Sequence, residues 1–193
     1  MTRPREFDID TALDRAMHVF WAKGYEAASL DDLCAATQLS RSSLYAAFGG
    51  KRDLLLQSLD RYAEHGTARI AELLATPPLR GALSCLARKF IDQIVEGPGR
   101  TGCFIGNSVA ELARRDQTVA AHLRRALARI ETTFHAALVA ARARKELAPG
   151  TDIEALARFL TSSFQGLRLM GKVNPDREAL NDIAFVMLRC LDE

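Results

Sequence analysis

Small polar and basic side chains stand together near the N-terminus, at residues 40–43, where the sequence reads Ser-Arg-Ser-Ser between two leucines. Such side chains give a hydrophobic core almost nothing to bury. A guanidinium group and several hydroxyls can instead bond to phosphate oxygens and to the polar edges of bases. The run therefore predicts a polar recognition surface, provided that the local structure turns it outward.

Three short predicted helices determine how this run is presented. Apolar residues at helical spacing predict a first helix from about residue 9 to Gly24, and Ser29 can cap a second one. Ser40 can cap a third, in which Leu44 and Phe48 lie four positions apart and share the buried side. The side chains left to face solvent are those of Arg41, Ser42 and Tyr45.

A short helix, a tight turn and a second helix with a polar first turn are typical of a helix-turn-helix, whose recognition helix offers N-terminal side chains to the major groove. Lys51 and Arg52 open the next helix, where backbone N–H groups and a cation can bind a phosphate. Arg3 and Arg5 precede the first helix on an arm that could reach a minor groove. A solvated three-helix packing unit without DNA binding is the alternative at this point.

Overall composition does not decide between these interpretations. The chain has 193 residues, 48% of them hydrophobic, and a net charge of +2, and residues 1–52 carry seven basic and seven acidic side chains. Only the clustering of Arg41, Lys51 and Arg52 at one edge favours DNA. The charged N-terminus does not resemble a secretory signal, and the longest apolar run, 183–188, is too short to span a bilayer. We expect a cytoplasmic protein with no membrane partner.

The cysteines and histidines do not indicate an enzyme. The four cysteines are widely separated and form no C-x-x-C pair, which argues against a metal site or a disulfide framework. The four histidines lie on separate helical segments, without an H-E-x-x-H or a G-x-S-x-G motif. We expect no catalytic residues, no cofactor and no bound metal.

The rest of the chain is also helical in its apolar periodicity, which predicts an all-α fold of about nine helices. The further helices are expected at 52–74, 79–95, 104–114, 117–147, 153–173 and 176–191. We expect a helix-turn-helix domain at residues 1–50, followed by a C-terminal helical bundle at 51–193.

Two stretches of the first sixty residues, FWAKGYEAASLDDL and ATQLSRSSLYAAF, together with the spacing Tyr45-x-x-Phe48-x-x-Lys51-x-x-Leu54, resemble the TetR/AcrR family of bacterial transcriptional regulators. The resemblance implies a DNA-binding regulator, a repressor that releases a palindromic double-stranded operator on binding a small molecule or on chemical modification. By the same resemblance, Arg41, Ser42 and Ser43 would face bases, and Thr37, Tyr45 and Lys51 would contact phosphates.

The resemblance also implies a homodimer that forms through the last two long helices. Both helices are rich in apolar residues, more than a peripheral pair would need. The interface residues expected on this ground are Leu156, Leu160, Leu167, Ile183, Met187 and Leu191.

The effector pocket or sensor is expected around Cys103, Phe104, Phe134 and Phe164. Cys103 follows a glycine-rich break at the start of a short helix, where the helix dipole and Arg100 favour a thiolate. A Gly-Cys at this point resembles a stretch of family relatives, some of which sense oxidants or electrophiles. We expect a small buried hydrophobe here, and keep the sensor as the alternative.

A helical protein-interaction adaptor without specific DNA binding is the alternative for the whole chain. Both this adaptor and an enzyme predict no sequence-specific shift of DNA in a gel.

Overall fold

The computed structural model describes residues 8–97 and 101–191, which form nine α-helices and no strand, as the periodicity predicts. Arg3, Arg5 and Arg100, for which roles were expected from the sequence, lie outside the described residues. The helices are α1 (Ile9–Lys23), α2 (Leu30–Thr37), α3 (Arg41–Phe48), α4 (Lys51–Leu74), α5 (Leu79–Glu96), α6 (Phe104–Leu112), α7 (Gln117–Ala143), α8 (Ile153–Val173) and α9 (Arg177–Leu188).

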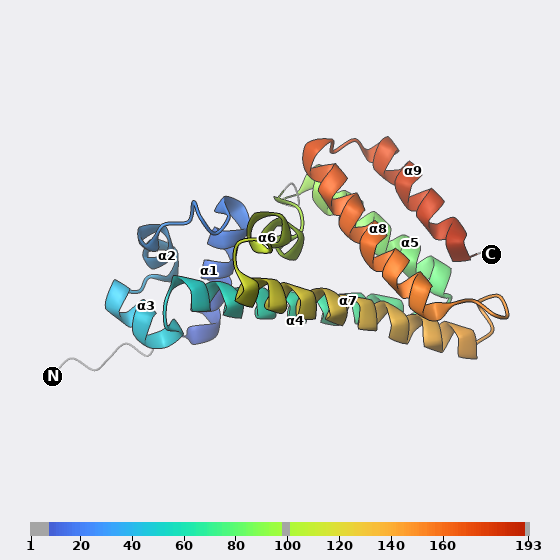
Figure 1. Cartoon of the computed structure of the whole chain (residues 1–193). Helices are drawn as coiled ribbons and strands as arrows, with labels where there is room; N and C mark the ends of the chain where they lie inside the picture. The colour runs from blue at the N-terminus through green and yellow to red at the C-terminus, as the bar shows by residue number, and fades with distance from the viewer. Residues whose placement is uncertain (1–7, 98–100, 192–193) are drawn as a thin grey trace.

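An N-terminal unit, residues 8–50, contains α1, α2 and α3 at one end of the molecule (Figure 1). The predicted caps are confirmed: the Ser29 hydroxyl accepts from the N–H of Asp32 at 3.0 Å, and the Ser40 hydroxyl accepts from the N–H of Ser43 at 3.1 Å. Phe20, Leu33 and Leu44 are fully buried and hold the three helices together.

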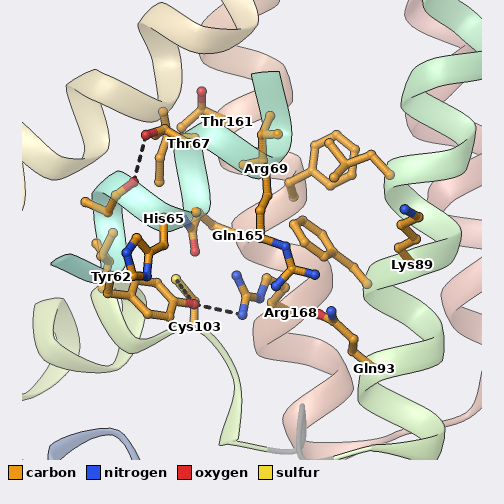
Figure 2. A pocket seen from close by; sticks show the side chains of 18 of the residues that line it. Tyr62, His65, Thr67, Arg69, Lys89, Gln93, Cys103, Thr161, Gln165 and Arg168 are labelled. Carbon is orange, nitrogen blue, oxygen red and sulfur yellow. Dashed lines mark hydrogen bonds between the residues drawn. The ribbon is translucent and has the colours of Figure 1, made fainter. Parts of the chain in front are cut away.

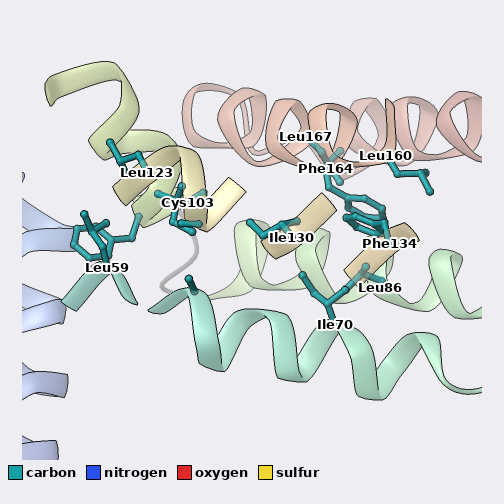
Figure 3. Packing of buried hydrophobic residues seen from close by; sticks show 14 of the residues in the cluster. Leu59, Ile70, Leu86, Cys103, Leu123, Ile130, Phe134, Leu160, Phe164 and Leu167 are labelled. Carbon is teal, nitrogen blue, oxygen red and sulfur yellow. The ribbon is translucent and has the colours of Figure 1, made fainter. Parts of the chain in front are cut away.

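A C-terminal bundle, residues 51–191, contains the other six helices. The long helices α4 and α7 run side by side, and α5, α8 and α9 pack at the end away from the N-terminal unit (Figure 1). Figure 3 shows the shared core, in which side chains of α4, α5, α7 and α8 meet, among them Ile70, Leu86, Phe134 and Phe164.

Helix α7 ends four residues before the predicted boundary, at Ala143. Lys145 takes a positive φ of 61°, so that the N–H of Glu146 bonds to the carbonyl of Ala141 and the N–H of Lys145 to that of Arg142. This pair of bonds is a Schellman motif, which ends a helix. The sequence did not indicate it because a lysine, and not a glycine, occupies the left-handed position.

Candidate DNA-binding surface and ligand cavity

The first turn of α3 presents a polar surface at the end of the N-terminal unit. The side chains of Arg41 and Ser42 are exposed, Tyr45 is 48% exposed, and Ser43 is half-buried. The Ser40 hydroxyl lies 2.9 Å from the hydroxyls of both Ser42 and Ser43, so the cap and its neighbours form one hydroxyl cluster. The outward orientation predicted for Arg41, Ser42 and Tyr45 is therefore present.

Arg41 is held in place by an acidic neighbour on α2. Its Nη2 lies 2.8 Å and its Nε 3.3 Å from Oδ1 of Asp31, and both side chains are largely exposed. An exposed ion pair of this kind contributes little stability because water screens it. Arg41 can exchange Asp31 for another acceptor at small cost.

Thr37, which is predicted to contact a phosphate, has a buried side chain. The residue is 5% exposed, and its hydroxyl donates to the carbonyl of Leu33 at 2.7 Å. The last turn of α2 packs this side chain inward, which does not favour a phosphate contact, and that role stays a prediction.

The two cations at the start of α4 serve different purposes. The ammonium of Lys51 lies 4.5 Å from the ring centroid of Tyr25 and 3.5 Å from the carbonyl of Glu26, and the side chain stays near the polar surface. Arg52 instead forms two hydrogen bonds to Asp116, the N-cap of α7, at 2.6 and 2.7 Å. Lys51 remains available to a phosphate, whereas Arg52 ties the N-terminal end of α4 to α7.

Helix α6 makes a second connection to the N-terminal unit. The carboxylate of Glu111 accepts hydrogen bonds from the backbone N–H groups of Tyr25 and Glu26 at 3.1 and 2.9 Å. These N–H groups belong to the turn between α1 and α2. These two hydrogen bonds connect α6 directly to the turn that precedes the helix-turn-helix.

A cavity of about 470 Å³ lies between the N-terminal unit and the bundle, with walls from α1, α4, α5, α6, α7 and α8 (Figure 2). This volume suits a small organic molecule. Cys103, Phe134 and Phe164 line it, as the sequence suggested for an effector pocket. Phe104 does not: it is buried and packs edge-on against Tyr62, with ring centroids 5.7 Å apart.

Cys103 is the N-cap of α6 and is 5% exposed. The predicted position at the start of the sixth helix is correct, and the thiol is a buried part of the cavity wall.

Sequence reasoning missed the polar residues of the cavity. Arg168 donates from Nη2 to the Tyr62 hydroxyl at 2.9 Å and to the Gly102 carbonyl at 3.1 Å, and Tyr62 donates to the Cys103 sulfur at 3.8 Å (Figure 2). Burial raises the pKa of Tyr62, so this phenol stays neutral at neutral pH. The available signal was Arg168 itself, a charge placed between two leucines of an apolar helix.

The predicted interface residues of α8 and α9 face mostly inward. Leu156, Leu160, Leu167 and Met187 are at most 8% exposed and pack within their own chain, which leaves little of their surface for a partner subunit (Figure 3 shows Leu160 and Leu167). Their place in the interface stays a prediction. Ile183 is 38% exposed and Leu191 half-buried. The exposed apolar side chains of these helices are Phe159, Leu169, Met170, Val173, Ile183, Phe185 and Val186.

The described residues contain neither a membrane-spanning helix nor a cluster of metal ligands. None of their helices is long and apolar enough to cross a membrane. No group of three or more His, Cys, Asp or Glu side chains in this part of the chain is arranged to hold a metal ion.

A recognition helix with an exposed polar first turn, joined through α4 to a helical bundle with a cavity, defines the class of helix-turn-helix transcriptional regulators. Family models agree with this class. Residues 12–57 match "Bacterial regulatory proteins, tetR family", and residues 81–186 match "Tetracyclin repressor-like, C-terminal domain". The chain belongs to the TetR family and is a DNA-binding transcriptional regulator.

Individual relatives cover nearly the whole chain. The HTH-type transcriptional regulator YezE of Bacillus subtilis (strain 168) is 34% identical over 194 residues, 100% of both chains. The HTH-type transcriptional repressor ComR of Escherichia coli (strain K12) is 34% identical over 193 residues, 99% of this chain and 92% of ComR. A cysteine mutant of the TetR family regulator CifR, solved with 26-base-pair operator DNA, is 33% identical with a TM-score of 0.85, covering 97% of this chain and 98% of CifR.

Proposed function

We propose that this regulator is a homodimeric repressor that binds a palindromic operator and releases it when a small molecule occupies the cavity. Residues 1–50 form the DNA-binding domain, and residues 51–193 bind the effector and form the dimer. Arg41, Ser42 and Ser43 read bases, and Tyr45 and Lys51 contact phosphates. The protein acts in the cytoplasm. The operator DNA bound to CifR and the repressor name of ComR support this proposal.

The observation that carries the proposal is the position of α6 between the two sites. Its N-cap, Cys103, belongs to the cavity wall, and Glu111 near its other end holds the backbone of Tyr25 and Glu26. A ligand that displaces the cavity wall therefore displaces the N-terminal unit through one short helix. Two conformations of the protein that differ in the position of the N-terminal unit differ in their affinity for the operator. A ligand that fits the cavity of only one conformation shifts the equilibrium toward that conformation.

Dimerisation is supported by the apolar residues left exposed on α8 and α9. Seven large hydrophobic side chains on these two helices are exposed, and clustering of this kind marks an interaction surface. A two-fold dimer carries two copies of α3, which can read two half-sites about one DNA turn apart, roughly 34 Å.

Fluorescence anisotropy with labelled DNA from upstream of the protein's own gene tests the proposal. We expect tight binding to this DNA, weaker binding to a scrambled duplex of equal length, and a loss of the difference in Arg41→Ala. A protein-interaction adaptor would bind neither duplex specifically. Sedimentation of the free protein as a monomer at the concentrations that bind DNA would contradict the dimer.

A further inference from the structure

The cavity is lined by positive charge and by no negative charge. Arg69 from α4, Lys89 from α5 and Arg168 from α8 all belong to its wall, whereas none of its lining residues is an aspartate or glutamate. In Figure 2 the guanidinium groups of Arg69 and Arg168 point into the same part of the cavity. Three cations from three helices around one space create a positive potential that an anion would satisfy.

Arg168 has no carboxylate partner within the part of the chain that the structure describes. Both of its protein acceptors, the Tyr62 hydroxyl and the Gly102 carbonyl, are neutral, and both bond to Nη2. The guanidinium carbon also lies 4.9 Å from the ring centroid of Phe90, which covers one of its faces. The N–H groups of Nε and Nη1 have no acceptor among the described residues. These N–H groups are not fully buried, so they remain free to donate to an anion bound in the cavity.

Two further polar atoms of lining residues are buried without a partner in the described chain: Nε1 of Trp21 and Oε1 of Gln165. Buried polar groups are ordinarily satisfied. The indole N–H can donate to an anionic oxygen, and the amide oxygen can accept from a hydroxyl or N–H group. Both atoms indicate a ligand with polar groups at one end.

The part of the wall next to Arg168 is aromatic. The rings of Phe134 and Phe164 stack with centroids 5.3 Å apart, and Phe90 meets Phe164 edge-on at 5.7 Å. Phe134 and Phe164 are at most 3% exposed, so a flat apolar ring system would meet this cluster mainly at the partly exposed ring of Phe90.

We propose that the effector is an organic anion, an aromatic ring system that carries a carboxylate, with the carboxylate at Arg168 and Arg69 and the ring against the phenylalanines. The inference rests on the proposed function in that it takes the cavity to be the effector site. It adds the chemical class of the effector and the two residues that select it.

The test compares 2-naphthoate with 2-naphthamide, which share a ring system and differ in charge, by isothermal titration calorimetry. We expect the carboxylate to bind about tenfold or more tightly than the amide, as a charge-assisted hydrogen bond predicts. Arg168→Gln and Arg69→Gln should each reduce this preference. Arg124→Gln, at an exposed position of α7, is the matched control and should leave it unchanged. Because Arg69 is exposed, its variant tests the proposal even if Arg168→Gln fails to fold.

Three results would overturn the inference. The two compounds bind equally well, neither compound binds, or the preference for the carboxylate survives both arginine substitutions. Operator release, followed with the same compounds, separates it from the proposed function. If naphthoate binds through the arginines and the operator stays bound, the ligand class stands and release by the effector fails. If the amide releases the operator as well as the carboxylate does, release stands and the anion is refuted.

Discussion

Replacing Arg41 with alanine should weaken operator binding because this guanidinium is the strongest donor on the exposed turn of α3. To reach a base it must leave Asp31, to which it is bonded at 2.8 Å. Both side chains are more than 60% exposed, so this pair contributes little and its loss costs less than a good base contact gains. We expect Arg41→Ala to weaken operator binding about 5- to 150-fold per half-site, the range of a single specific base contact, and a dimer on two half-sites loses this factor twice.

The assay is fluorescence anisotropy on two labelled duplexes, the operator and a scrambled sequence of equal length, each measured at the same series of salt concentrations. A base contact predicts that Arg41→Ala loses affinity for the operator and little for the scrambled duplex. Lys51→Ala should weaken both alike and reduce the salt dependence by about one phosphate contact. Asp31→Ala should strengthen binding to both, because it removes a negative charge beside the DNA and releases Arg41.

Two results would refute the reasoning. If Arg41→Ala lowers affinity for both duplexes equally, the arginine contacts phosphate and not a base. If neither Arg41→Ala nor Lys51→Ala changes binding while circular dichroism shows an intact fold, DNA is bound through a different surface.

Further predictions concern the other parts of the molecule. Phe185→Glu places a charge on the exposed face of α9 and should dissociate the dimer in sedimentation and abolish operator binding in anisotropy experiments. Val139→Glu, at an exposed apolar site on α7, is the control and should do neither. If Phe185→Glu remains a dimer, the interface lies elsewhere. Glu111→Ala should lower the free energy of unfolding by about 1 to 3 kcal/mol, measured in urea, because two backbone N–H groups lose their acceptor, and an unchanged midpoint would count against the link. Hydrogen bonds from the Arg52 guanidinium lower the pKa of Asp116 to about 2. The free energy of unfolding of the wild type should therefore exceed that of Asp116→Asn in full above about pH 4, and this difference should fall away as the pH approaches 2. A difference that is independent of pH would contradict an origin in the ionised carboxylate. Cys103→Ser should keep operator binding, since burial gives this residue a packing role; release by a mild oxidant in the wild type but not in the variant would instead assign it a sensing role.

Local chemistry made much of the N-terminal unit predictable. The caps Ser29 and Ser40 and the buried pair Leu44 and Phe48 follow from hydrogen bonding and periodicity within a few residues, and the structure contains them all. The burial of Thr37 was not predicted because it depends on how α2 packs, which the sequence of the turn does not reveal.

The bundle was less predictable because its residues meet across long separations. Trp21, Arg69 and Arg168 line one cavity although about fifty and one hundred residues separate them in sequence. Helix α8 carries apolar side chains on several faces, so its periodicity could not distinguish Leu160, which packs inward, from Phe159, which is exposed.

The bond between Glu111 and the N-terminal unit uses only backbone N–H groups, so it is indifferent to the side chains at positions 25 and 26. It favours Gly24, whose φ of 82° strains any other residue and whose Cβ, if present, would lie 3.0 Å from the carboxylate, a tight contact. The exposed side chains of α3 take no part in this joint, whereas α1 lines the cavity with Met17, His18 and Trp21. Operator preference can therefore diverge in evolution through α3 while α1 and the glycine of the turn keep the cavity and its connection unchanged.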